Sequence, residues 1–200
     1  GLEVHKVKRS GDDPVRTILK YLSDHEPDLI VLATHQRCGL SRWINRSIAE
    51  PIARHSRLMT LFVPRRVVGF VSTENGSVRL QHILVPVDHA PEPQNGLDAA
   101  ACIARALGCA RVHFTLLHVG EAETAPQPER PLQPGWTFES KIVSGEVVDG
   151  ILNTSEDHDA DLIVMPTAGR DGFLDALRGS TTEQVLRGAR CPVLAVPAQA

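Results

Sequence analysis

The chain has 200 residues, enough for one large domain or two small ones that each bury a core. A formal net charge of −3 and a pI near 6.3 give no electrostatic reason to expect binding to nucleic acid or to an anionic membrane. No apolar run is long enough to cross a bilayer, nothing at the start resembles a signal peptide, and four cysteines without CxxC spacing favour reduced thiols in the cytoplasm.

Residues 1–64 predict alternating strands and helices. Residues 2–8 are expected to form a strand, and the segment SGDDPVRTIL at 10–19 is expected to begin a helix. The apolar run DLIV at 28–31 predicts a strand. A second helix follows Ser47, and the segment closes with an apolar strand that ends at Pro64.

Residues 65–81 are predicted to be a linker that contains a β-hairpin. Two runs rich in β-forming residues flank Asn75-Gly76 within residues 67–80. Asn-Gly between such runs is a strong signal for a tight hairpin turn.

Residues 82–200 predict a regular alternation of strands and helices. The predicted strands are 82–88, 111–119, 136–143, 161–166 and 192–197. The predicted helices are 97–107, 145–158 and a segment that begins at Ser180. Strands that alternate with helices indicate a parallel sheet covered on both faces, which is a doubly wound α/β domain. Nine histidines are scattered through the chain, and the close pair His113 and His118 alternates badly for one strand face, so packing or surface roles are expected.

The chain repeats itself. Residues 28–64 align without a gap to residues 161–197, at an offset of 133, with 14 identities in 37 positions. Chance would not give an ungapped match of this length. The sequence therefore predicts two tandem modules of one kind, called the first repeat (1–64) and the second repeat (82–200) below. The first repeat has no counterpart of residues 82–119 and is incomplete.

Three polar or glycine-containing stretches follow predicted strands of the second repeat. They are Pro86-Val87-Asp88, Val119 and the segment PTAGRDG at 166–172, and a helix begins soon after at Ser180. Ligands of open parallel sheets bind beyond the carboxyl ends of the strands, where a helix N-terminus also favours phosphate. Asp88 could contact a ribose hydroxyl, contact a metal-bound phosphate, or cap the next helix. The Gly-Ser-Thr-Thr cluster at 179–182 could likewise be a helix cap, with Glu183 completing a capping box.

Both repeats resemble the universal stress protein family, and the most specific parts of the resemblance are ILVPVD, LLHV, the Gly-Ser helix start and CPVLAV, all in the second repeat. This resemblance implies a fold of the adenine nucleotide alpha hydrolase type. ATP-binding members carry G-x2-G-x9-G-[S/T] after the fourth strand, and the second repeat matches it except that Pro166 takes the place of the first glycine. The residues expected near the nucleotide are Pro86, Val87, Asp88, Val119, Met165, Pro166, Gly169, Gly179, Ser180, Thr181 and Thr182.

The resemblance also implies a role for each part of this set. Gly169 and residues 179–181 would hold the phosphates, and Asp88 would lie near the ribose and near Mg²⁺ bound through the nucleotide. Val87 and Val119 would line the adenine slot, with Met165 and Thr182 completing its wall. Family members often have His where this chain has Ala168, which removes a polar contact.

The motif is degenerate in the first repeat. Its three glycine positions hold Ala33, Gln36 and Arg46, and only Ser47 is kept. Side chains at these positions crowd the phosphate path, and the strand that would carry the aspartate is absent. We therefore expect one nucleotide site per chain and a structural or dimerising role for the first repeat.

The leading functional hypothesis is a cytoplasmic stress-response protein that binds ATP and Mg²⁺ and acts as a nucleotide-gated interaction module for an unknown protein client. No general base is evident near the Gly-Ser helix, so at most weak ATPase activity is expected. An alternative is a dimerisation module that binds no nucleotide. A pyrophosphatase or adenylyl transferase is disfavoured, because the sequence lacks SGGxDS, HxGH and KMSKS motifs.

The incomplete first repeat leads to a further expectation. Without its first two strands, its sheet has a gap or an exposed edge, which attracts another chain. Residues of a longer tandem protein, a rearranged strand order that uses the hairpin at 67–80, or a second subunit could fill this gap. The first is preferred, so the chain is expected to be part of a longer tandem protein and, in addition, to form a homodimer.

Overall fold

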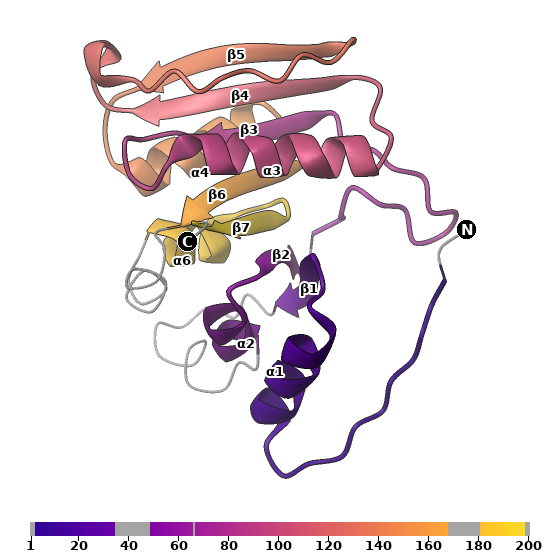
Figure 1. The fold of residues 1–200 in the computed structure, drawn as a ribbon. Helices are drawn as coiled ribbons and strands as arrows, with labels where there is room; N and C mark the ends of the chain where they lie inside the picture. The colour runs from indigo at the N-terminus through magenta and orange to yellow at the C-terminus, as the bar shows by residue number, and fades with distance from the viewer. Residues whose placement is uncertain (1–2, 35–48, 66, 168–180, 199–200) are drawn as a thin grey trace.

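The computed structural model describes residues 3–34, 49–65, 67–167 and 181–198, which form one seven-stranded α/β sheet (Figure 1). The strands are β1 (Leu29–Thr34), β2 (Met59–Pro64), β3 (His82–Pro86), β4 (Val112–Val119), β5 (Trp136–Val143), β6 (Leu162–Thr167) and β7 (Val193–Pro197). The helices are α1 (Pro14–His25), α2 (Ala49–Ser56), α3 (Pro93–Ala106), α4 (Val147–Asp157) and α6 (Thr181–Gly188), with a 3-10 turn η1 (Ala122–Thr124). The predicted α/β class is confirmed.

The sheet is parallel except at one junction. Its strand order is β1-β2-β7-β6-β3-β4-β5, and only β2 and β7 run antiparallel to each other. At this junction Leu61 is paired with Leu194, which occupies the same position of the other repeat. The closing strands of the two repeats therefore meet about a local two-fold axis within one continuous sheet.

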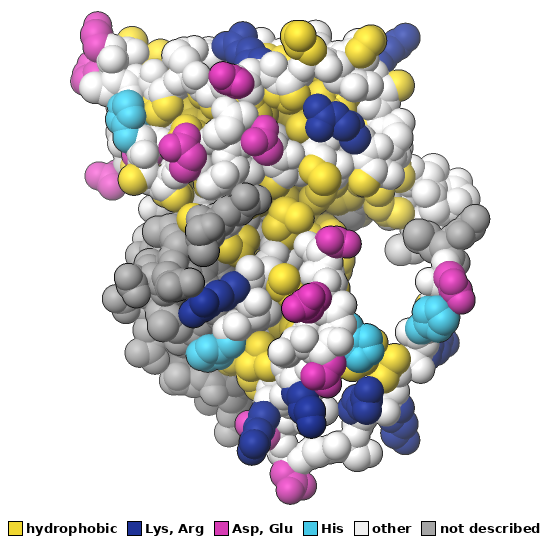
Figure 2. Space-filling model, viewed as in Figure 1, with side chains coloured by type: hydrophobic (Ala, Val, Ile, Leu, Met, Phe, Trp, Pro, Cys, Tyr) yellow, Lys and Arg dark blue, Asp and Glu magenta, His cyan; other side chains and the backbone are white. Residues whose placement is uncertain are grey.

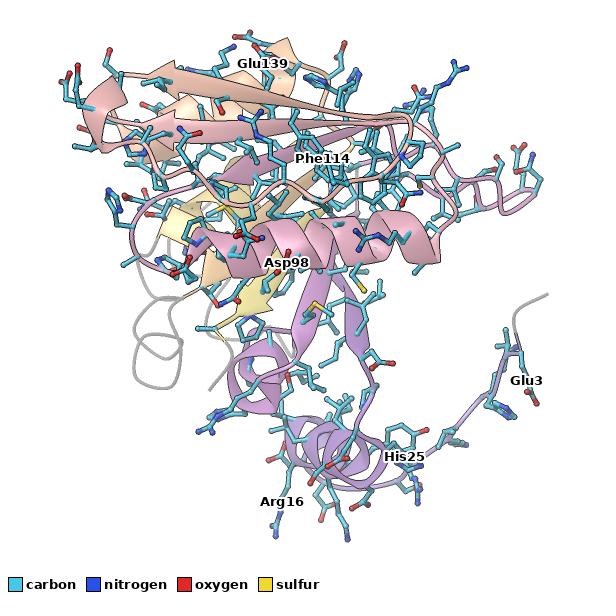
Figure 3. All side chains as sticks on the ribbon, turned by 45° about the horizontal axis from the view of Figure 1, so that its top comes forward. Glu3, Arg16, His25, Asp98, Phe114 and Glu139 are labelled. Atoms are coloured by element: carbon cyan, nitrogen blue, oxygen red, sulfur yellow. The ribbon has the colours of Figure 1, made fainter. Side chains whose placement is uncertain are left out.

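Two hydrophobic cores lie on opposite faces of this sheet. Side chains of β4 contribute to both cores, because successive side chains of a strand point to opposite sides of the sheet. Phe114 belongs to the core under α3, as Figure 3 shows, whereas Leu117 belongs to the core under α4 and α6. Small residues of α3, such as Ala100, are fully buried and let the helix lie close to the strands.

The predicted hairpin linker forms as a turn with one antiparallel bridge. Val71 bridges to Val78, and Gly76 takes a φ of 72°, which suits glycine. Phe70 and Leu80 are buried in the same core as Leu61 of β2. The linker therefore covers a part of the sheet that lies beyond α3.

Most predicted boundaries agree with the structure within a few residues. β5 has the bounds predicted for it, whereas α3 begins at Pro93, four residues earlier than predicted. Proline suits the first turn of a helix because its N–H is not needed there. α1 begins after Asp13, whose carboxylate accepts hydrogen bonds from the N–H groups of Val15 and Arg16 at 2.9 and 3.2 Å.

The strand predicted at residues 2–8 was wrong for the part that the structure describes. Residues 3–13 form no strand or helix and run away from the sheet to Glu3 (Figures 1 and 3). In the second repeat the matching strand, β5, pairs with β4 along its whole length. The described part of the first repeat has no counterpart of β4, so residues 3–8 lack a backbone with which to pair.

Candidate functional site

The sheet brings the ends of three predicted site strands to one edge. β6, β3 and β4 are consecutive and parallel, so their carboxyl ends lie together. This edge carries residues 86–88, Val119 and residues 165–167. In Figure 1 the arrowheads of β4 and β6 point to this side. Parallel order therefore assembles segments that are far apart in the sequence.

Val87 is held by backbone and side-chain contacts just beyond β3. Its N–H donates to the carbonyl of Leu117 at 2.8 Å, and its own carbonyl accepts from Nδ1 of His118 at 3.1 Å. The second ring nitrogen of His118 lies 3.2 Å from Oγ1 of Thr124 in η1. His118 is only 5% exposed, so it connects the ends of β3 and β4 from inside the fold.

Sequence reasoning did not include His118 in the site. His113 and His118 do face opposite sides of β4, as expected, and His113 contacts Thr137 and Glu139 on β5. The missed signal was a polar residue near the end of an otherwise apolar buried strand, directly before Val119. Such a residue needs hydrogen-bond partners, and here they come from the segments around the candidate site.

Asp88 is exposed at the tip of β3. Its Oδ1 accepts a hydrogen bond from the N–H of His89 at 2.8 Å. The N-cap of α3 is Glu92, so Asp88 does not cap this helix. Of the three roles considered for Asp88, the structure excludes the helix cap and leaves a carboxylate facing solvent at the strand edge.

Met165 and Pro166 lie on opposite faces of β6. Met165 is buried in the core under α6. Pro166 lies against α3, where a Cβ added to Gly96 would come within 3.0 Å of its ring. The proline at the first motif position is therefore matched by a glycine on the helix that covers it, and its ring packs against that helix.

Only the end of the predicted phosphate-binding segment lies within the described residues. Gly169, Gly179 and Ser180 lie outside the described residues, so the proposed Ser180 cap does too. Thr181 begins α6, and Thr182 is buried beside Glu183. Glu183 forms an ion pair with Arg187, one turn along α6.

The first repeat presents different groups at the matching positions. Ala33 lies near the end of β1 and is exposed. Gln36, Arg46 and Ser47 lie outside the described residues. On the far side of β1 from β2, no described strand provides an aspartate as β3 does beside β6.

Within the described residues no three His, Cys, Asp or Glu side chains gather as a metal site, and no helix is long and apolar enough to cross a membrane. Charges of both signs are interspersed on the face in Figure 2. Cys102, Cys109 and Cys191 are free thiols, and burial, with a smaller contribution from Asp161, raises the pKa of Cys191 to about 12.

Sequence comparison identifies the family. The model of the universal stress protein family matches residues 1–64 and 79–197. The chain belongs to this family. A universal stress protein of Methanocaldococcus jannaschii is 39% identical over 62 residues, which are 31% of this chain and 36% of that protein.

Solved structures share the fold. A universal stress protein from Archaeoglobus fulgidus superposes with a TM-score of 0.68 and 21% identity, covering 92% of this chain and 65% of that one. A functionally unknown protein from Pseudomonas aeruginosa superposes with a TM-score of 0.58 and 17% identity, covering 94% of this chain and 69% of that one. The chain thus spans about a third of the curated relative and about two thirds of these structures.

Proposed function

We propose that the second repeat binds ATP with Mg²⁺ at the edge formed by β6, β3 and β4. The observation that carries this proposal is the convergence of Val87, Asp88, Val119 and Met165 at one strand edge in a universal stress protein fold. Ligands of open parallel sheets bind at such edges. Mg²⁺ would be bound mainly through the nucleotide phosphates, with Asp88 beside it.

Each proposed contact follows from the chemistry of its group. Val87 and Val119 offer apolar surface to a flat base, Val119 also offers its backbone polar groups, and Met165 and Thr182 lie on the neighbouring elements. Gly169, Gly179 and Ser180 would cradle the phosphates through N–H and hydroxyl groups, because glycine allows close approach of the backbone.

We further propose that residues 1–64 and 82–200 are tandem modules joined by residues 65–81, and that only the second binds nucleotide. Ala33, Gln36 and Arg46 replace the motif glycines in the first. Its role would be structural, and the nucleotide would gate binding of a protein client in the cytoplasm. Hydrolysis would be slow, since the sequence offers no general base near the Gly-Ser helix start.

Calorimetric titration with ATP and Mg²⁺ tests this proposal. We expect about one ATP per chain. Gly179→Val should abolish binding, because a branched side chain blocks the phosphate path, while the circular dichroism spectrum stays native. Arg46→Ala, at the matching position of the first repeat, is the control and should bind like the unchanged protein. Two equivalent sites, or full affinity in Gly179→Val, would contradict the proposal.

A homodimerisation role is the second candidate, and one observation favours it. β1 is an edge strand in the described sheet, and Val31 on it is 59% exposed. Exposed strand edges pair readily with other chains. Light scattering should report a dimer, whereas a monomer at high concentration would exclude this role. Absence of ATP binding together with a dimer would favour this candidate over the first.

A further inference from the structure

The connection from β4 to β5 returns along the sheet without an α-helix. Residues 120–135 are all described and contain one 3-10 turn, η1, and their trace runs back beside β5 (Figure 1). Parallel neighbours are usually joined through an α-helix. Proline disfavours a helix here, because it lacks an N–H and clashes with the preceding turn. The prolines are Pro126, Pro128, Pro131 and Pro134, and residues 125–134 are called the strap below.

Proline chemistry keeps most of the strap extended. Proline holds φ near −65°, and the residue before a proline is pushed to extended or polyproline II backbone. Within the strap only Glu129 and Leu132 are neither a proline nor directly before one. In polyproline II form a strap of this length reaches about 31 Å. The eight residues of β5 span about 26 Å, so the extended strap can return along the strand.

A side chain of α3 fixes one of the two residues that the prolines leave unrestricted. Oε1 of Gln94 accepts from the Glu129 N–H at 2.8 Å, and Nε2 of Gln94 donates to the Glu129 carbonyl at 3.1 Å. Nε2 also donates to Oδ1 of Asp98 at 2.9 Å, which orients the amide. Next along the strap, Arg130 donates to the Ser140 hydroxyl of β5 at 2.9 Å. The strap is therefore tied to both α3 and β5.

Leu132 is the second unrestricted residue and faces solvent. Its exposed fraction of 98% is the highest among the large apolar side chains that the structure describes. A single exposed leucine needs no explanation, but this one lies within a Pro-x-x-Pro sequence that is held extended. Pro128 and Pro131 are half-buried, whereas Pro134 is exposed. The strap thus offers Leu132 and Pro134 as apolar contacts.

We propose that the strap is a docking segment for a partner protein whose aromatic-lined groove binds polyproline II, with Leu132 and Pro134 inserted into that groove. Pro-x-x-Pro segments suit such grooves because polyproline II is preformed and loses little entropy on binding. The hold of Gln94 on the strap lowers this cost further. The inference concerns the protein client of the proposed function and does not depend on the nucleotide site.

Purified SH3, WW and EVH1 domains are the probes, because their grooves bind polyproline II. We expect the unchanged protein to bind at least one of them saturably without nucleotide, as measured by NMR of the labelled domain. A proline-rich peptide ligand of that domain should displace the protein. Leu132→Asp should weaken binding about tenfold or more, because it places a charge in an apolar groove. Val68→Asp is the matched control, since Val68 is 89% exposed but lies in the linker, and it should bind like the unchanged protein.

Gln94→Ala tests the presentation of the strap. Amide exchange of Glu129 should be slow in the unchanged protein and fast in this variant, because its N–H loses its acceptor. Binding of the same domain should weaken about threefold, since the strap is then ordered only on binding. Melting temperatures of all variants show whether they are folded.

The outcomes separate this inference from the nucleotide site. Binding to none of the domains, or equal binding by Leu132→Asp and the unchanged protein, would overturn it. Equal loss in Leu132→Asp and Val68→Asp, or binding that the proline-rich peptide does not displace, would place the contact elsewhere and also overturn it. Fast exchange of Glu129 in the unchanged protein, or undiminished binding by Gln94→Ala, would overturn the role of Gln94. Because no step uses nucleotide, failure of ATP binding leaves the docking segment standing.

Discussion

The segment DLIV occurs at the start of β1 and at the start of β6, and its two copies have different environments. Val164 of β6 is fully buried, whereas Val31, the same position of β1, is 59% exposed. α3 covers β6, and β3 pairs beside it. Among the described strands, β1 pairs with β2 alone, and no strand lies on its other side. Identical local sequence thus gives a core strand in one repeat and an edge strand in the other.

The aspartates of the two segments show the same difference. Asp161 accepts hydrogen bonds from the N–H groups of Gln81 and His82 at 2.8 and 3.0 Å, and so fixes the start of β3. Asp28, its counterpart, is exposed before β1. An identical residue stabilises a strand junction only where the neighbouring strand is present.

A charge in place of the two valines gives the largest expected contrast. Val164→Asp should lower the free energy of unfolding by about 4 kcal/mol or more, because it buries a carboxylate without a partner. Val31→Asp should change it by less than about 0.5 kcal/mol, since water reaches the side chain. Urea unfolding followed by circular dichroism measures both. A large loss in Val31→Asp would mean that another chain covers β1 in solution.

Alkaline pH tests how well the second repeat excludes water around Cys191. Its folded pKa of about 12 lies above the ordinary value of 9.0, so the unfolded state loses its proton first as pH rises. The contribution of this thiol to stability is complete below pH 9. It should fall by up to about 4 kcal/mol as pH rises to 12.

Cys191→Ala isolates this effect from other groups that titrate at high pH. Its stability should decline less steeply between pH 9 and 12 than that of the unchanged protein. At pH 8 a thiol reagent should modify exposed Cys102 and leave Cys191 unreacted until the protein unfolds. Parallel pH curves for the two proteins would contradict the burial of this thiol.

Phe70→Ala tests whether the linker covers the sheet in place of a helix. Phe70 is buried in the core with Leu61, so its loss should cost about 3 kcal/mol. Val71→Ala is the control, because Val71 is mostly outside this core and should cost far less. Equal effects, measured by thermal unfolding, would show that the linker does not pack in solution as it does in the structure.

Gly76→Ala should have the smallest of these effects. An alanine at a φ of 72° is strained, which costs about 1 kcal/mol. Gly69→Ala is the matched control, because a Cβ there meets nothing within 4 Å and the backbone is not in the left-handed region. No difference between the two variants would show that the turn at Asn75-Gly76 relaxes freely.

The sequence by itself determined the α/β class, the repeat and most element positions, because periodicity and turn residues act locally. It placed Asp88 and Val119 at strand ends, and parallel order alone predicted that they share an edge. It could not show that residues 3–8 lack a strand, because strand formation depends on a distant partner. Only the tertiary structure decided that Val31 is exposed while Val164 is buried. Only the structure placed His118 against the Val87 carbonyl, because that contact joins residues 31 positions apart on neighbouring strands.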